Sequence, residues 1–350
     1  MNNLVIPAAG LSSRFPNMKP KWLLTHPDGR LMIEKVLNCF KRENYDRVII
    51  TILKEHAKQY SADLILEQIF GNSVEICILE KQTKDPAETV IKTIKKMNLK
   101  GFIVIKDSDC YVTAEYPLDE QYICGLAINK MPNTGRISNK SFIVKNEEGI
   151  ITDIIEKKVA SDTICLGVYG LEIEKLLLAY DRISKSPSYR YGNEMYISHI
   201  VSYLISQGQI MHFIEANEFI DWGTLKDWRR EQEKFATYFL DIDGVFLENT
   251  GKYGQKNWSN TFKPIEQNMQ MLKELSDSGA QIIFTTARTE EYLAEFKKLM
   301  ANRDIRYKSI VSGCNHSQRI LINDFAPTNP YPSCNSVSVP RNSYLGDYIK

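Results

Sequence analysis

Short apolar runs alternate with longer stretches of helical periodicity through most of the chain. Runs rich in β-branched residues, typical of buried strands, occupy residues 4–7, 47–53, 74–80 and 101–106. Apolar residues recur at helical spacing in residues 32–40, 56–70, 86–97, 172–183 and 195–208. From about residue 118 to 170 the runs are shorter and resemble hairpins added to the same sheet. This alternation predicts an α/β domain with a mixed, mainly parallel sheet.

A second α/β unit is predicted to begin at TYFLDIDGVFLE. Helices are predicted over residues 265–279 and 289–303, and strands over residues 280–288 and 319–325. The helical segment at residues 221–236 leads into this unit without a linker rich in Pro, Gly or Ser. We therefore predict two Rossmann-like domains, residues 1–236 and a smaller domain at residues 237–350.

Composition narrows the class of protein. The chain of 350 residues is longer than a usual single domain of about 100–200 residues. Its formal net charge of +1 argues against nucleic acid as a partner and against an anionic membrane surface. Since no signal-peptide pattern or long apolar run is present, we expect no membrane insertion and a cytoplasmic location. The seven cysteines contain no CxxC pair and are interpreted as reduced packing residues.

The first apolar run ends in a turn of small residues that also carries cations. The small residues are Ala8, Ala9, Gly10, Ser12 and Ser13. The alanines and the glycine allow a close backbone approach, and the serines are placed to cap a helix. Such a strand-to-helix turn directs N–H donors toward an anion. Lys21 follows the stiff Pro20, so its ammonium can reach a phosphate. An ordinary turn with surface cations is the alternative interpretation.

Acidic residues follow two of the later elements. Asp107 and Asp109 end the run GFIVIKDSD, and alternate residues of a strand point the same way. Asp221 lies in FIDWGT, beside a tight turn. Mg²⁺ favours one or two protein carboxylates together with phosphate and water, so these acids are candidate metal ligands. For each acid, a role in a turn or cap is the alternative.

Together these motifs resemble the sugar-phosphate nucleotidylyltransferases, over roughly the first 230 residues. The resemblance lies in PAAGLSSRF followed by PK, the acid after VIK, IIEKK and DWGT. It implies that the small-residue turn binds a nucleoside triphosphate and that Arg14 and Lys21 bind its phosphates. It also places Asp109 and Asp221 on Mg²⁺, with Asp107 as an alternative to Asp109.

The same resemblance implies the reaction and further contacts. Gln82 takes the place of a base-reading residue, while Lys157 and Glu194 take the places of residues that contact the acceptor. An oxygen of a phosphorylated sugar or small polyol attacks the α-phosphorus and releases pyrophosphate, for bacterial capsule or lipopolysaccharide synthesis. CTP is favoured, but PAETV departs from the family pattern, so UTP, dTTP and GTP stay open.

The second predicted domain resembles the haloacid dehalogenase-like phosphatases, over roughly residues 237–345. The resemblance rests on D-x-D-G in FLDIDGVFLEN, on Thr286 at the end of one strand and on Asp324 at the end of another. It implies that Asp241 is the nucleophile, Asp243 the general acid/base and Thr286 a phosphate ligand. The implied Mg²⁺ ligands are Asp241, Asp243 and Asp324. The usual lysine is missing, because Lys308 comes too early and only Arg319 lies near the last strand.

Other interpretations stay open at this point. The second domain could dephosphorylate a related intermediate or simply buttress the first. The whole chain could be a non-catalytic regulatory protein that binds nucleotide, or a phosphatase with an inert first domain. The sequence also leaves open whether the protein forms a homo-oligomer.

Overall fold

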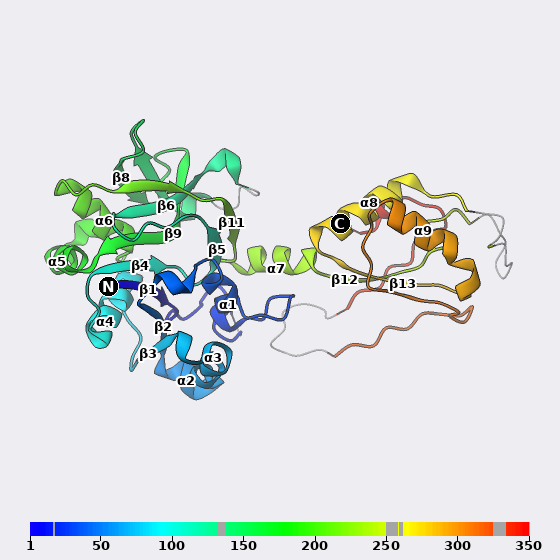
Figure 1. Ribbon diagram of the computed structural model, residues 1–350, viewed down its shortest axis with the longest axis horizontal. Coiled ribbons are helices and arrows are strands. Elements are labelled where there is room, and N and C mark those ends of the chain that lie inside the picture. The colour runs from blue at the N-terminus through cyan, green and yellow to red at the C-terminus, as the bar shows by residue number, and fades with distance from the viewer. Residues whose placement is uncertain (17, 132–136, 250–257, 259–261, 325–333, 350) are drawn as a thin grey trace. The chain divides into compact units, whose positions relative to one another are not determined.

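The computed structural model describes residues 1–16, 18–131, 137–249, 258, 262–324 and 334–349 (Figure 1). The chain divides into two compact units, Met1–Asp227 and Trp228–Lys350, here called unit 1 and unit 2. Within the described segments, every helix is too short or too polar to span a bilayer.

Unit 1 is built on a mixed sheet in which four neighbouring strands run parallel to one another. Among the described residues this sheet has nine strands, ordered β10-β6-β9-β4-β1-β2-β3, with β7 pairing with β8 and β9. The strands of unit 1 are β1 (Asn2–Pro7), β2 (Arg47–Leu53), β3 (Glu75–Leu79), β4 (Phe102–Lys106), β5 (Cys110–Thr113), β6 (Tyr122–Ala127), β7 (Ser141–Lys145), β8 (Ile151–Glu156), β9 (Thr163–Glu172), β10 (His212–Glu215) and β11 (Glu218–Asp221). β9 runs antiparallel to β4 and β6. The predicted α/β sheet of unit 1 is therefore confirmed.

The helices of unit 1 cover this sheet and enclose its core. They are α1 (Met32–Leu37), α2 (Lys54–Tyr60), α3 (Ala62–Phe70), α4 (Pro86–Met97), α5 (Ile173–Ile183), α6 (Ile197–Ser206) and α7 (Leu225–Lys234), the last spanning the division between the units. Buried aliphatic residues of the strands pack against α4, α5 and α6. Figure 1 shows α2 and α3 beside β2 and β3. The single helix predicted over residues 56–70 is wrong, because Ser61 adopts a left-handed backbone (φ 52°) and separates two helices.

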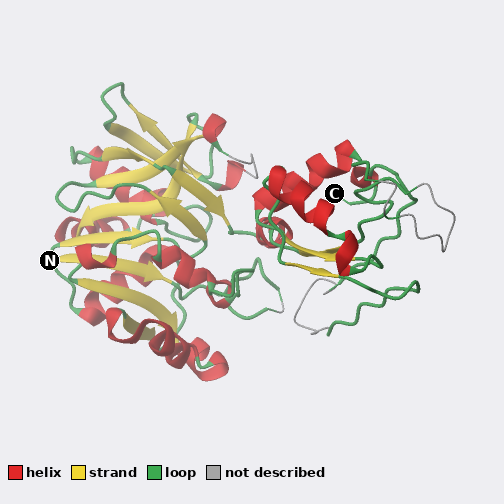
Figure 2. Cartoon of the chain, turned by 45° about the vertical axis from the view of Figure 1, so that its right-hand side comes forward, coloured by secondary structure: helices red, strands yellow, loops and turns green. Residues whose placement is uncertain are grey.

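Unit 2 has a smaller sheet of three parallel strands among its described residues, with helices packed on it (Figure 2). Its elements are β12 (Thr237–Leu240), α8 (Glu266–Ser278), β13 (Gln281–Thr285), α9 (Ala294–Asn302) and β14 (Ser309–Val311). The core contains Phe246, Phe284 and Phe296. Phe284 contacts both other rings edge-on.

One predicted strand of unit 2 is wrong. Residues 319–324 have no regular secondary structure, and Phe325 lies outside the described residues. Ile320, Leu321 and Ile322 are 77%, 48% and 89% exposed. The third strand is β14 instead, which pairs with β13. The apolar run alone suggested a strand, but a strand also needs a neighbouring strand for its backbone hydrogen bonds, and no described strand pairs with this segment.

Candidate functional site

The loop after β1 is closed by a serine rather than by a helix. Ser12 has a positive φ of 53°, and its Oγ accepts a hydrogen bond of 2.9 Å from the N–H of Lys21. Residue 17 apart, no helix begins between Pro7 and Pro20, so the predicted helix cap at Ser12 and Ser13 is wrong. Prolines at positions 16 and 20 each remove a backbone donor, which explains why the segment does not become helical. An anion bound here would contact N–H groups of the loop and cationic side chains, and it would gain no stabilisation from a helix dipole.

The remaining residues predicted to bind the nucleotide differ in how exposed their side chains are. Ala8 and Ala9 are buried, and the N–H of Ala8 donates to the carbonyl of Thr51. Gly10, Ser13, Arg14 and Gln82 are exposed, the last in the loop between β3 and α4. A Cβ added at Gly10 would meet no atom within 4 Å, so nothing within the chain itself requires glycine there.

Two of the predicted carboxylates meet beside Gly223. β11 pairs antiparallel with β5, which places Asp221 opposite Cys110. A Cβ built on Gly223 would lie 3.0 Å from Oδ1 of Asp221, 3.3 Å from Oδ2 of Asp109 and 3.9 Å from Nη1 of Arg14. Three side chains predicted to act together therefore converge on one point, although they are far apart in the sequence.

Each of these carboxylates is held by a lysine. Nζ of Lys21 lies 2.5 Å from Oδ2 of Asp109. Asp221 forms an ion pair with Lys140, a residue that sequence reasoning missed. Lys140 lies just before β7, in a stretch without a recognisable motif. Its partner Asp221 is distant in the sequence and takes its place in the fold through the pairing of β11 with β5.

Asp107 lies in the same turn as Asp109 but faces a different neighbour. β4 ends at Lys106, so the two acids do not alternate along a strand as predicted. The N–H of Asp107 donates to the carbonyl of Gly167, and a Cβ at Gly167 would lie 2.2 Å from Oδ2 of Asp107. Lys106 is fully buried, and its Nζ donates to the carbonyl oxygens of Asp107 and Cys110, at 2.7 and 2.9 Å. This buried ammonium stabilises the turn that contains Asp107 and Asp109.

The two acids of this turn differ in pKa. Burial alone would raise the pKa of Asp109, but the ammonium groups of Lys21 and Lys140 outweigh it and hold that pKa below its usual range. Although Asp107 remains open to solvent, the protein atoms around it and the charge of Asp109 raise its pKa. Asp109 is therefore the carboxylate that keeps its negative charge as the pH falls.

Lys157 and Glu194 lie in a second cluster. The ammonium of Lys157 lies 4.7 Å and 4.0 Å from the ring centroids of Tyr191 and Tyr196. Tyr196 donates its hydroxyl proton to Glu194. Lys157 has a positive φ of 52°, and burial lowers its pKa, with a smaller contribution of the same sign from Arg14. The guanidinium of Arg14 itself lies near the carboxylates beside Gly223.

In unit 2, two predicted residues follow adjacent parallel strands. Asp241 comes directly after β12, while Thr286 follows β13 and is fully buried. Asp243 accepts hydrogen bonds from Nε and Nη2 of Arg288, at 2.9 and 2.6 Å. Asp324 lies on the exposed segment that was predicted as a strand. The sequence pattern did not indicate the pairing of Asp243 with Arg288.

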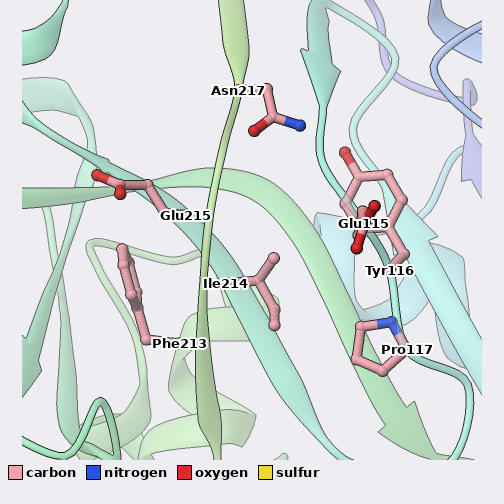
Figure 3. Close-up of a pocket in the computed structure, with 7 residues that line it drawn as sticks. All are labelled: Glu115, Tyr116, Pro117, Phe213, Ile214, Glu215 and Asn217. Atoms are coloured by element: carbon pink, nitrogen blue, oxygen red, sulfur yellow. The ribbon is translucent and has the colours of Figure 1, made fainter.

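A pocket of about 660 Å³ lies elsewhere on unit 1 (Figure 3). It is lined by Glu115, Tyr116, Pro117, Phe213, Ile214, Glu215 and Asn217. None of the predicted site residues lines this pocket, so its position does not follow from the motifs.

The acids beside Gly223 are candidate ligands for Mg²⁺. In the described part of the chain, no three His, Cys, Asp or Glu side chains form a cluster that could hold a metal ion. Two carboxylate oxygens nevertheless approach the same point at Gly223. This donor set fits Mg²⁺, which often takes one or two carboxylates and draws its other ligands from phosphate and water. The metal itself stays a prediction.

Comparison with known proteins defines the class of fold. No protein-family model and no curated protein matches this chain. Solved structures do match, and those named below cover the N-terminal two thirds of the chain. Unit 1 therefore has the fold of the sugar nucleotidyltransferases.

Three of these structural neighbours show the extent of the match. A nucleoside-diphosphate-sugar pyrophosphorylase from Vibrio cholerae RC9 is 23% identical with a TM-score of 0.56, covering 66% of this chain and 99% of that one. The CTP:phosphocholine cytidylyltransferase from Streptococcus pneumoniae is 18% identical with a TM-score of 0.51, covering 66% and 98%. The inositol-1-phosphate CTP transferase from T. maritima is 12% identical with a TM-score of 0.50, covering 67% and 96%.

Proposed function

We propose that unit 1 transfers a nucleotidyl group from a nucleoside triphosphate to a phosphorylated sugar or small polyol and releases pyrophosphate. The observation that carries this proposal is the convergence of Arg14, Asp109 and Asp221 beside Gly223, with Lys21 paired to Asp109. The likeness of unit 1 to the sugar nucleotidyltransferases supports it.

The charges of the site suit a triphosphate. Four cations, Arg14, Lys21, Lys106 and Lys140, accompany the three carboxylates Asp107, Asp109 and Asp221. An excess of positive charge attracts a polyanion and stabilises the negative charge that develops during phosphoryl-type transfer. Asp109 and Asp221 would hold Mg²⁺, which when bound supplies further positive charge to the phosphate oxygens.

The chain needs no nucleophile of its own for this reaction, because the acceptor phosphate attacks the α-phosphorus. Arg14 and Lys21 would bind and orient the triphosphate. Lys157 would bind the acceptor phosphate, and Glu194 would contact the rest of the acceptor. Since its guanidinium lies beside the two carboxylates, Arg14 would hold the triphosphate next to the metal ligands.

We further propose CTP as the donor nucleotide, with Gln82 beside the base and the exposed Gly10 and Ser13 along the phosphates. The names of two structural neighbours, a CTP:phosphocholine cytidylyltransferase and an inositol-1-phosphate CTP transferase, support this choice. A product of this kind would serve capsule or lipopolysaccharide synthesis, and its triphosphate donor belongs to the cytoplasm.

Pyrophosphate release tests the proposal. Each of CTP, UTP, dTTP and GTP is incubated with Mg²⁺ and a panel of sugar, polyol and choline phosphates. Lys21→Ala and Asp109→Ala should each lose at least about 100-fold in turnover while the protein stays folded. Lys130→Ala is the matched control, because Lys130 is exposed and pairs with Glu215 on the surface. Tight nucleotide binding without pyrophosphate would favour the regulatory alternative.

For unit 2 we propose phosphomonoester hydrolysis, supported by the position of Asp241 and Thr286 at the carboxyl ends of adjacent parallel strands. Asp241 would attack the phosphorus and displace the alcohol, which would take a proton from Asp243, the residue held by Arg288. Asp243 would then take a proton from a water molecule that releases phosphate from Asp241. Phosphate release from the same panel should fall to background in Asp241→Asn. If phosphate release stays at background in the wild type as well as in Asp241→Asn, unit 2 has only a structural role.

A further inference from the structure

Each of the two carboxylates that converge beside Gly223 is paired with an ammonium group. At Asp109 the lysine contacts Oδ2, the oxygen nearest Gly223, whereas at Asp221 the lysine contacts Oδ2 and Oδ1 faces Gly223. Lys21 contacts Asp109, and Lys140 contacts Asp221. The side chains of Lys140 and Asp221 are 27% and 25% exposed, so solvent can reach this pair. The ammonium of Lys140 also lies 5.5 Å from the ring centroid of Phe219, which precedes Asp221 by two residues on β11.

The backbone of Lys140 connects this carboxylate to the second cluster. The carbonyl of Lys140 accepts a hydrogen bond of 3.1 Å from the N–H of Lys157. Lys157 has the positive φ noted above, a backbone conformation that is maintained only when surrounding contacts hold it. Lys140 therefore pairs with Asp221 through its side chain and fixes Lys157 through its main chain.

We propose that Lys140 is a positioning residue which occupies Asp221 while no metal is bound and moves to the nucleotide phosphates when Mg²⁺ takes Asp221. This inference rests on the proposed function of unit 1. Two carboxylates close to one point repel each other, and the two ammonium groups remove that repulsion. A divalent ion at this point would compete with the ammonium of Lys140 for the negative charge of Asp221, whose Oδ2 faces the lysine and whose Oδ1 faces Gly223.

The displaced ammonium does not leave the site. Its backbone remains bonded to Lys157, so the freed Nζ stays within reach of a phosphate bound between the carboxylates and the second cluster. Lys21 cannot take over this task at Asp221, because its own ammonium contacts Asp109. The exchange thus couples the arrival of the metal with an added positive charge at the phosphates.

Metal binding separates this role from a merely structural one. Mn²⁺ affinity is measured by electron paramagnetic resonance, without nucleotide, in the full-length wild type, Lys140→Met and the control Lys130→Met. Because the competing ammonium is gone, Lys140→Met should bind Mn²⁺ about fivefold tighter. The same variant should show a KM for nucleotide that is about tenfold higher, since one phosphate contact is lost. Lys130→Met should change neither value.

The outcomes are distinguishable. A residue that only holds the fold would weaken both metal and nucleotide binding when replaced, and that result overturns the inference. Lys140→Gln, which keeps a hydrogen-bond donor without the charge, should repeat the gain in Mn²⁺ affinity if Lys140→Met does not fold. If the wild type transfers nucleotide but neither Lys140 variant binds Mn²⁺ more tightly, this inference is wrong and the proposed function stands. A wild type that binds no Mn²⁺ and releases no pyrophosphate from any of the four triphosphates overturns the proposed function as well.

Discussion

Gly223 offers the sharpest test of the shared site, because a side chain added there would approach both carboxylates. In Gly223→Ala the new methyl group would lie 3.0 Å from Oδ1 of Asp221 and 3.3 Å from Oδ2 of Asp109. A carbon–oxygen contact is comfortable at about 3.4 Å, so the Asp221 carboxylate must move by about 0.4 Å. The N–H of Gly223 also donates to that same oxygen at 2.9 Å, which opposes the movement.

The size of the effect follows from this displacement. A misplacement of about 1 Å in an active site can cost about 100-fold in rate, so about 0.4 Å predicts roughly a tenfold loss in kcat. This corresponds to about 1.4 kcal/mol of transition-state stabilisation. The φ of Gly223 lies outside the left-handed region, so alanine should not strain the backbone. We therefore expect the free energy of unfolding to stay within about 0.5 kcal/mol of wild type.

Gly208→Ala provides the opposite result and serves as the control. Gly208 follows α6, has a φ of 80°, and would place its Cβ where no atom lies within 4 Å. Alanine in this left-handed conformation should cost about 1 kcal/mol of stability and leave turnover unchanged. Pyrophosphate release and urea unfolding are measured for both variants.

The reasoning is refuted if Gly223→Ala keeps wild-type kcat and wild-type dependence on Mg²⁺ concentration. Asp109 and Asp221 would then not act on a common ion. A loss of activity accompanied by a large loss of stability would also count against it, since the structure predicts an effect confined to the site.

Two further predictions concern stability. Lys106→Met should lower the free energy of unfolding by about 2–3 kcal/mol in urea, because the buried carbonyl oxygen of Cys110 and the partly buried one of Asp107 lose their donor; an unchanged midpoint would contradict this. Partial burial opposes ionisation of Asp28, but Lys35, the N–H of Arg30 and His26 outweigh it and lower the pKa of Asp28 to about 2. Its stabilisation is therefore present above about pH 4 and is lost as the pH falls toward 2. After allowance for solvent screening, Asp28→Asn should be less stable by about 1 kcal/mol at pH 7, and thermal unfolding should show the gap closing by pH 2 to 3.

Local signals were strong where the sequence predicted an element correctly. α4 begins at Pro86 after Asp85, whose side chain accepts the N–H of Glu88, so both the start residue and the cap are visible in the sequence. The runs that became β1, β2 and β4 are continuously buried, as parallel strands between helices require. Residue type and spacing also pointed to Lys21, Asp109 and Asp221, whose convergence the structure shows.

The errors arose where a distant contact outweighs the local pattern. The helix predicted after Ser12 is replaced by a loop that Ser12 closes onto the N–H of Lys21. The apolar run at Ile320–Ile322 has the composition of a strand, but it is exposed and pairs with no strand among the described residues. Composition describes what a segment can form, whereas pairing requires a neighbour in space.

The sequence by itself determined the alternation of strands and helices in unit 1, and it supplied the cations and carboxylates of the site. Only the tertiary structure decided which of them meet, because the antiparallel pairing of β5 with β11 brings Asp221 beside Asp109. The lysines at positions 106 and 140 show the same dependence. Lys106 is buried under a turn, and Lys140 contacts Asp221 on β11. The residues next to each lysine in the sequence do not predict either contact.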